Sequence, residues 1–253
     1  CWSLVGSEMC IRDSNLIDRC KSSGFKAMCL TVDTVVAGNR ERDHRWGFTT
    51  PPKLTMKSIL SFMMHPKWAF NYLTNKKFEL ANVSHWTKKG SSIAKGVMEY
   101  INEQYDPAMS WKDAEYVIKK WGGPFALKGV MSVEDAKRAV DIGASAIMLS
   151  NHGGRQLDGS RSPFDQLPAI ADAVGGKIEI ILDGGIRRGT HVLKALSLGA
   201  TACSFGKGFL FALGAGGQKG VEQILTRMKD EIRRDMILLG CKSIKELNKT
   251  KIA

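Results

Sequence analysis

Short apolar runs recur along the chain, and segments of helical periodicity separate most of those in its second half. The runs that we interpret as strands are residues 25–31, 124–128, 144–149, 178–182 and 201–205. Between the later runs, residues 133–142, 164–174 and 188–198 place apolar side chains at the three- and four-residue spacing of an amphipathic helix. This alternation predicts βαβ units and a parallel sheet.

Two further helices complete the predicted pattern. A helix-like segment from Asn15 leads into the first strand, and residues 216–239 read as a long C-terminal helix. In that helix one face is predicted to carry Val221, Ile224, Leu225, Met228 and Ile232. Glycines at 143, 176 and 199 mark the junctions between elements.

The first predicted strand is separated from the second by a long interruption, and residues 51–105 within it are basic and rich in aromatic side chains. This stretch contains eight lysines against three glutamates. Its large apolar residues include Phe62, Met63, Met64, Trp68, Phe70, Tyr72, Phe78 and Trp86. Lysine interleaved with such residues suits the surface of an anionic membrane. The alternative is a solvent-exposed insertion whose aromatic residues pack onto the main fold.

The net charge of +12 over 253 residues allows several anionic partners. Nucleic acid is not expected, because no recognisable nucleic-acid-binding motif or arginine-rich arm occurs. The six cysteines form no C-x-x-C pair and no zinc-ligand spacing, so we expect reduced thiols and no metal site.

The strongest chemical signal is the polar cluster that follows the apolar run 144–149. Residues 150–156 read Ser-Asn-His-Gly-Gly-Arg-Gln. A histidine and an arginine three residues apart can converge on one small anion, with the imidazole accepting a proton and the guanidinium binding a carboxylate. A lone histidine at a strand end is more often structural, but a polar cluster at the C-terminal end of a strand in a repeating βα chain favours an active site.

This cluster resembles the active-site signature of the FMN-dependent α-hydroxy-acid dehydrogenases and oxidases, and the resemblance extends over about residues 15–253. It implies an α/β fold of the TIM (β/α)8 barrel type, of which the five predicted strands are the last five. We therefore expect a partial barrel with the insertion 51–105. Such an open sheet leaves unpaired edges and should be unstable or self-associate when alone. Residues 1–14 match nothing in the family and resemble an adaptor-derived leader.

The resemblance assigns catalytic roles. His152 matches the family base, and Asp33 the carboxylate that pairs with it. Arg155 and Arg40 match the two arginines that clamp the substrate carboxylate; Arg42 is a rival for Arg40. Lys128 matches the lysine that stabilises the reduced flavin. From the residues alone, Asp33 reads as a turn or cap residue. A lysine that ends an apolar strand and precedes Gly129 favours an anionic ligand at Lys128, with a lysine that only reaches the rim of the sheet as the alternative.

The resemblance also implies an FMN site. Hydroxyls of Thr31 and Ser150 would contact the flavin ring together with Lys128. Two glycine-rich turns would hold the ribityl chain and phosphate, and their residues are Asp183, Gly184, Gly185, Ile186, Arg187, Gly206 and Lys207. The family usually has arginine where this chain has Lys207, so the bidentate fork is lost while the charge is kept.

The implied reaction is oxidation of an (S)-2-hydroxy acid, most closely L-lactate to pyruvate, with electrons passed to a quinone or cytochrome. An oxidase using O2, a mandelate dehydrogenase and an inactive fragment that only binds anionic membrane stay open as alternatives. The resemblance further implies a homo-oligomer and a cytoplasmic location, peripheral on the inner membrane.

Overall fold

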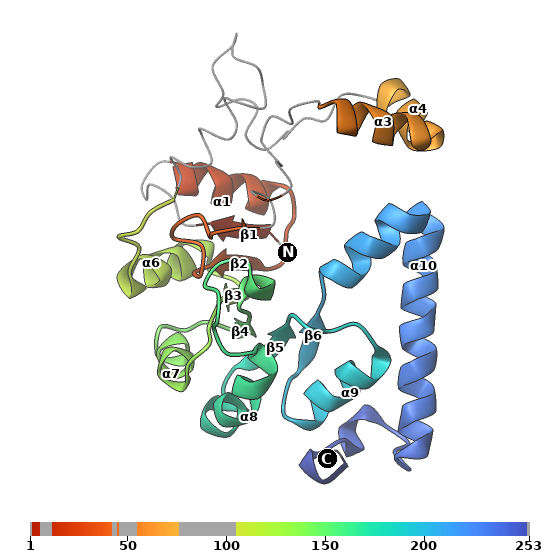
Figure 1. Cartoon of the computed structure of the whole chain (residues 1–253). Coiled ribbons are helices and arrows are strands. Elements are labelled where there is room, and N and C mark those ends of the chain that lie inside the picture. Colours follow the sequence, from red (N-terminus) through yellow and green to blue (C-terminus); the bar gives the residue numbers. More distant parts are fainter. Residues whose placement is uncertain (1, 6–11, 42–44, 46–54, 76–104, 252–253) are drawn as a thin grey trace. The chain divides into compact units, whose positions relative to one another are not determined.

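A computed structural model of the chain describes residues 2–5, 12–41, 45, 55–75 and 105–251 (Figure 1). Its contacts form two compact units, Cys1–Asn39 with Asp106–Ala253, and Arg40–Tyr105. The first unit contains a parallel sheet whose strands follow one another in chain order. These strands are β1 (Trp2–Val5), β2 (Met28–Thr31), β3 (Phe125–Lys128), β4 (Ala146–Leu149), β5 (Glu179–Asp183) and β6 (Ala202–Ser204).

All but the last helix of the first unit lie between successive strands in the chain, and α6 to α9 lie along one side of the sheet in Figure 1. They are α1 (Arg12–Ser22), α6 (Trp111–Trp121), α7 (Val133–Asp141), α8 (Pro163–Val174), α9 (Gly189–Ser197) and α10 (Lys207–Leu238). Three short 3-10 turns are η2 (His152–Gly154), η3 (Ile244–Glu246) and η4 (Lys249–Lys251). The predicted α/β architecture is therefore confirmed, with each of the five predicted strands present.

The number of strands differs from the prediction. The described sheet has six strands, because β1 pairs in parallel with β2 and aligns Val5 with Thr31. Four residues at the very start of the chain carry too short a pattern to signal a strand. The adaptor-like origin of residues 1–14 stays a prediction.

The largest differences from the sequence pattern in the first unit concern two helices. Helix α10 begins at Lys207, nine residues before the predicted start, and is kinked at Gly217, where φ is 58°. Glycine at this position permits the turn between the two parts of the helix. Helix α6 was not predicted, although Ser110 and Asp113 form a capping box at its start.

One face of the sheet is buried beneath the helices. Phe125 and Leu127 of β3, Ile147 and Leu149 of β4, and Ile180 and Leu182 of β5 are at most 1% exposed. The alternate residues of β3 and β5 are only partly buried, and these include Lys128 and Asp183. Because side chains alternate across a strand, the half-exposed face leads directly to the polar strand ends.

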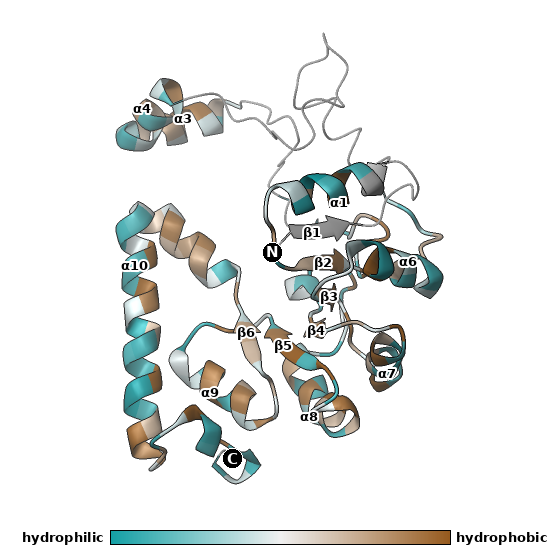
Figure 2. Cartoon of the chain, turned by 180° about the vertical axis from the view of Figure 1, so that it is seen from behind, coloured by the Kyte–Doolittle hydropathy of each residue, from teal (hydrophilic) through white to brown (hydrophobic). Residues whose placement is uncertain are grey.

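The helices complete this core with their apolar residues, which colour parts of the helix ribbons brown in Figure 2. Leu167 and Ile170 of α8 are fully buried, and Met228 of α10 is 6% exposed. The predicted stripe of α10 is only partly used, because Leu225 is half exposed.

Four cysteines of the described residues are buried or partly buried, and Cys20 belongs to the apolar core. Burial raises the pKa of Cys29 and of Cys203 to about 11, so both thiols stay protonated at neutral pH. Among the described residues, Cys20, Cys29, Cys203 and Cys241 are free thiols. Among the described residues no cluster of potential ligands could hold a metal ion.

The second unit contains two described helices, α3 (Met56–Met64) and α4 (Pro66–Thr74). Thr55 caps α3 and Pro66 begins α4, so the chain turns sharply at His65. Trp68 stacks on Phe62 and on Tyr72, with ring centroids 5.0 Å and 5.3 Å apart. Neither helix has a buried residue, and in the described part of the chain no helix has the length and apolarity to cross a membrane.

Candidate active site

The predicted site residues of the first unit gather at the carboxyl ends of the strands. The register aligns Thr31 of β2 with Lys128 of β3, and Asp183 of β5 with Ser204 of β6. Ser150 directly follows β4, between these two pairs. Parallel strands thus bring polar groups from five segments to one edge, where α/β proteins place ligand sites.

Asp183 contacts two of these groups. Its Oδ2 atom accepts a hydrogen bond of 2.8 Å from the Ser150 hydroxyl and lies 3.6 Å from Lys128 Nζ. Ser150 is fully buried, and the side chains of Lys128 and Asp183 are 21% and 16% exposed. A partly exposed ammonium that is only loosely paired retains donors for an anionic ligand.

His152 lies next to Asp33, although the two are far apart in the sequence. His152 Nδ1 is 3.3 Å from Asp33 Oδ1, so the loop after β4 meets the loop after β2. This contact leaves Nε2 as the ring nitrogen available to a substrate. His152 also adopts a left-handed backbone conformation with φ of 56°, which is uncommon for a residue with a side chain.

The loop conformation of His152 is held by local hydrogen bonds. The His152 amide donates to Ser150 Oγ over 3.1 Å, and the Gly154 amide donates to the Asn151 side chain over 3.3 Å. Gly153 and Gly154 also have positive φ values, of 67° and 72°. The two glycines therefore permit the tight turn that presents the imidazole.

The two arginines predicted to bind the substrate carboxylate lie in different units of the structure. Arg155 follows this turn and is exposed, in the same unit as His152. Arg40 is the first residue of the second unit, so its role stays a prediction. Its rival, Arg42, lies outside the described residues.

The two glycine-rich turns follow β5 and β6. Gly184 and Gly185 have φ values of 110° and 72°, and a Cβ atom added at Gly185 would meet no atom within 4 Å. Ile186 is buried, which anchors the turn, whereas Arg187 is exposed. After β6, Gly206 is likewise open.

Lys207 reaches across to the histidine turn. Its Nζ atom donates a hydrogen bond of 2.8 Å to the Gly153 carbonyl. The exposed Lys207 ammonium and the turn that presents His152 are therefore neighbours.

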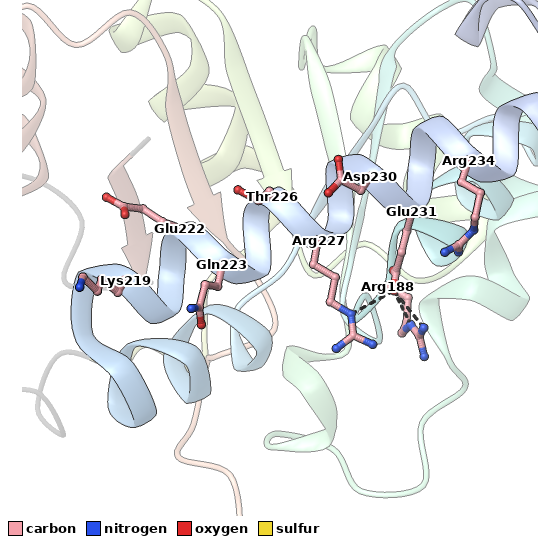
Figure 3. Close-up of a pocket in the computed structure, with 9 residues that line it drawn as sticks. All are labelled: Arg188, Lys219, Glu222, Gln223, Thr226, Arg227, Asp230, Glu231 and Arg234. Atoms are coloured by element: carbon pink, nitrogen blue, oxygen red, sulfur yellow. Dashed lines mark hydrogen bonds and ion pairs between the residues drawn. The ribbon is translucent and has the colours of Figure 1, made fainter.

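A buried carboxylate on α10 holds the start of α9, directly after the turn that follows β5. Glu231 of α10 accepts hydrogen bonds from Arg188 Nε at 3.0 Å and from the Gly189 amide at 2.8 Å. Arg227 adds a third donor, and Figure 3 shows both guanidinium groups directed at Glu231. The groove drawn in Figure 3 contains none of the predicted site residues. We interpret it as the surface of the ion-pair network that joins α9 to α10.

We expect this network to give the protein an acid-sensitive stability. Hydrogen bonds lower the pKa of Glu231 from 4.5 to about 2. The bond from Arg188 has the largest effect, followed by the bond from the Gly189 amide. A lowered pKa means stability that is present above pH 4.5 and lost as the pH falls towards 2. Glu231→Gln should lower the free energy of unfolding by about 3 kcal/mol at neutral pH, measured by urea denaturation.

The pH dependence distinguishes this prediction from a general packing defect. The difference between parent and Glu231→Gln should shrink to about half by pH 3. Glu222→Gln changes an exposed carboxylate on the same helix and should alter neither quantity. A difference that is constant between pH 7 and pH 3 would refute the assignment.

Three residues with no predicted individual role also shape the site. Gln156 donates to the carbonyl oxygens of Asp33 and Val36, and a Cβ atom at Gly38 would lie 2.2 Å from the Arg155 carbonyl oxygen. Gly129 lies under Asp33, where a Cβ atom would be 2.7 Å from that of Asp33. Gln156 belongs to the predicted signature, but the two glycine contacts join distant segments and leave no local sequence signal.

Comparisons with known proteins identify the family of the chain. The family model described as FMN-dependent dehydrogenase matches residues 10–253. The L-lactate dehydrogenases of Xanthomonas campestris pv. campestris (strain 8004) and Vibrio cholerae serotype O1 (strain M66-2) are 43% and 42% identical over 238 and 236 residues. These alignments cover 92% and 93% of this chain but only 60% and 62% of the relatives.

Solved structures give the same result. The monotopic membrane protein (S)-mandelate dehydrogenase superposes with a TM-score of 0.92 at 30% identity, over 100% of this chain and 66% of that protein. Mandelate oxidase with (S)-2-phenylpropionate superposes with a TM-score of 0.73 at 34% identity, over 98% of this chain and 60% of that one. The fold, the polar strand ends and the sequence similarity agree, and this chain belongs to the FMN-dependent dehydrogenase family.

Proposed function

We propose that the polar edge of the sheet binds FMN and an (S)-2-hydroxy acid, and that the chain oxidises L-lactate to pyruvate. The observation that carries this proposal is the meeting of His152 and Asp33 beside the cluster of Lys128, Ser150 and Asp183. A base with a carboxylate partner and a cation for an electron-rich cofactor are the groups that this reaction requires.

The donor set fits FMN. Lys128 and the Ser150 and Thr31 hydroxyls offer polar contacts for the flavin ring, and Asp183 offers an acceptor for the ribityl hydroxyls. Gly185 leaves open space at the turn, while Arg187 and Lys207 supply positive charge for the phosphate. When bound, FMN supplies the two-electron oxidant.

The substrate is held and deprotonated by the chain's own residues. Arg155 would bind the carboxylate through its guanidinium fork, with Arg40 as the second clamp. His152 Nε2 would take the hydroxyl proton, since Nδ1 faces Asp33. Asp33 would stabilise the imidazolium that results, and Lys128 would place positive charge at the reduced cofactor.

L-lactate is the preferred substrate because the relatives that are 41–43% identical are named L-lactate dehydrogenase. (S)-Mandelate is the second candidate, because the protein with the TM-score of 0.92 is a mandelate dehydrogenase. Anaerobic mixing with each acid separates them. We expect L-lactate to bleach the flavin absorbance faster than (S)-mandelate does, and the reverse order would favour the second candidate.

A quinone or cytochrome is the proposed electron acceptor, with O2 as the alternative, and a homo-oligomer is the proposed assembly. Re-oxidation of the reduced protein by a soluble quinone analogue should be faster than by air. Faster re-oxidation by air would favour an oxidase.

The helices α3 and α4 are proposed to contact an anionic membrane. Their exposed apolar side chains include Met56, Leu60, Met63, Met64, Phe70 and Leu73, each more than half exposed. Lys57 and Lys67 add positive charge beside them. Apolar area together with lysine is the composition of an interfacial helix pair, and the similar mandelate dehydrogenase is a monotopic membrane protein.

Charge placed on this surface should release the protein from membranes. We expect the double variant Phe70→Glu with Leu73→Glu to weaken binding to anionic vesicles by about tenfold or more, because two apolar side chains lose their burial in the bilayer interface. Sedimentation with the vesicles measures the bound fraction. Ile237→Glu with Leu238→Glu alters two equally exposed positions on α10 and serves as the control. Equal binding of both double variants would refute the membrane proposal.

A further inference from the structure

The two loops that carry Asp33 and His152 are joined by contacts outside the dyad itself. These contacts come from Gln156 on the loop after β4 and from Gly38 on the loop after β2. Both loops belong to the first compact unit. We call the contact between Gln156 and residues 33–38 the loop seam.

Gln156 provides the hydrogen bonds of the seam. Its Nε2 atom donates to the Asp33 carbonyl at 3.2 Å and to the Val36 carbonyl at 2.9 Å. One side chain thus uses both amide protons on two carbonyls of the opposite loop, 123 and 120 residues earlier in the chain. Gln156 is partly buried, and its hydrogen bond to the Asp33 carbonyl is partly shielded from water, whereas the bond to the Val36 carbonyl is exposed.

Asp33 depends on this backbone anchor because its own side chain is weakly held. One oxygen faces His152 at 3.3 Å, and the other, Oδ2, is buried with no hydrogen-bond partner in the described structure. Gly129 allows the carboxylate to lie directly over the backbone after β3. The position of the carboxylate is therefore set mainly by its backbone, and Gln156 fixes that backbone at the Asp33 carbonyl.

Gly38 makes the seam close enough for these hydrogen bonds. A Cβ atom there would lie 2.2 Å from the Arg155 carbonyl oxygen and 2.8 Å from Gln156 Cα. Both neighbours are backbone atoms, so any larger residue must push the loops apart. Since Gly38 does not have a positive φ value, alanine would fail through this collision and not through backbone strain.

We propose that Gln156 is a positioning residue, which acts on the reaction by holding Asp33 against His152 through the loop seam. This inference rests on the proposed function, because it takes the Asp33–His152 pair as the base. Gln156 itself need not touch substrate. A displacement of about 1 Å at a reacting group can lower a rate by about 100-fold, so a seam with two hydrogen bonds can matter for turnover.

Hydrogen exchange of the full chain tests the seam without any reaction. Gln156→Ala should raise the exchange rate of the Val32 amide by about tenfold. This amide donates to the Lys128 carbonyl directly before Asp33, and the loop that follows it loses two hydrogen bonds to its carbonyl oxygens. Gln218→Ala removes a glutamine that donates to Glu222 on its own helix and should leave the Val32 amide unchanged. Unchanged exchange in Gln156→Ala would overturn the proposal.

Kinetics of the full chain loaded with FMN tests the positioning role. Gln156→Ala should slow flavin reduction by L-lactate about 10- to 100-fold while FMN affinity, measured by quenching of flavin fluorescence, stays unchanged. In an Asp33→Asn background the same change should cost less than about threefold, because Gln156 acts through Asp33. Effects that multiply in the double variant would overturn the proposal.

The outcomes separate this inference from the proposed function. If the parent is not reduced by L-lactate, or if Asp33→Asn leaves reduction unchanged, the proposed function fails, and hydrogen exchange alone decides on the seam. If Asp33→Asn slows reduction and Gln156→Ala does not, only the present inference fails. Should Gln156→Ala not fold, Gly38→Ala opens the seam from the other loop and must give the same two results. Its control is Gly216→Ala, which meets no atom within 4 Å.

Discussion

Replacing His152 with alanine should slow flavin reduction by L-lactate by about 10²–10⁴-fold, the usual cost of losing a general base. His152 is the imidazole that the described structure places beside a carboxylate at the strand ends, with Nδ1 3.3 Å from Asp33. Rapid mixing under anaerobic conditions measures the rate directly from the flavin absorbance. FMN affinity should stay close to that of the parent, because the predicted ring and phosphate contacts come from other residues.

The control for this experiment is His65→Ala. His65 lies between α3 and α4 in the second unit, and its Nδ1 contacts the Ser61 carbonyl within that unit. Its removal should leave the reduction rate unchanged. Near-normal reduction by His152→Ala would remove His152 from the role of base.

Replacing Arg155 with leucine should lower kcat/KM for L-lactate by about 10²–10³-fold, because the substrate carboxylate loses a charge-assisted, bidentate partner. Arg155→Lys keeps the charge without the fork and should fall between the parent and Arg155→Leu. Steady-state kinetics with an artificial electron acceptor measures all three proteins.

Arg161→Leu provides the matched control for Arg155. Arg161 is an exposed arginine on the same loop, and only its backbone carbonyl contacts the site, through Asn151. Its replacement should leave kcat/KM unchanged. Equal losses in the two leucine variants would indicate a general effect of charge, and no loss in Arg155→Leu would contradict the clamp.

The sheet could be predicted from sequence because each strand is a short apolar run between glycines and helical periodicity. Boundaries shifted by one to three residues where apolar residues extend past the hydrogen-bonded ladder, as at Phe25 before β2. The strand β1 was not predicted because no helical or strand-like pattern flanks the short run Trp2–Val5. Helix α10 is kinked at Gly217, and only the part after the kink shows a clear apolar stripe. The part before the kink was therefore not predicted.

The candidate site was predictable where its residues form local motifs. Residues 150–156 and the turn after β5 can be recognised in the sequence because polar and glycine residues directly follow buried strands. The pairing of Asp33 with His152 came from family resemblance, and the geometry agrees with it. Gly38 and Gly129 could not be found in this way, because the need for glycine arises only when another loop lies within a few ångströms in the folded chain.

The proposed FMN site at the polar edge of the sheet and the proposed oxidation of L-lactate can be tested together. The most direct measurement is the flavin absorbance before and after anaerobic addition of L-lactate, for this chain and for a version extended at its N-terminus to the length of its relatives. We expect the extended protein to retain FMN on purification and to bleach on addition of L-lactate. Absence of bound flavin from both proteins, or bound flavin that L-lactate does not bleach, would contradict the proposed function.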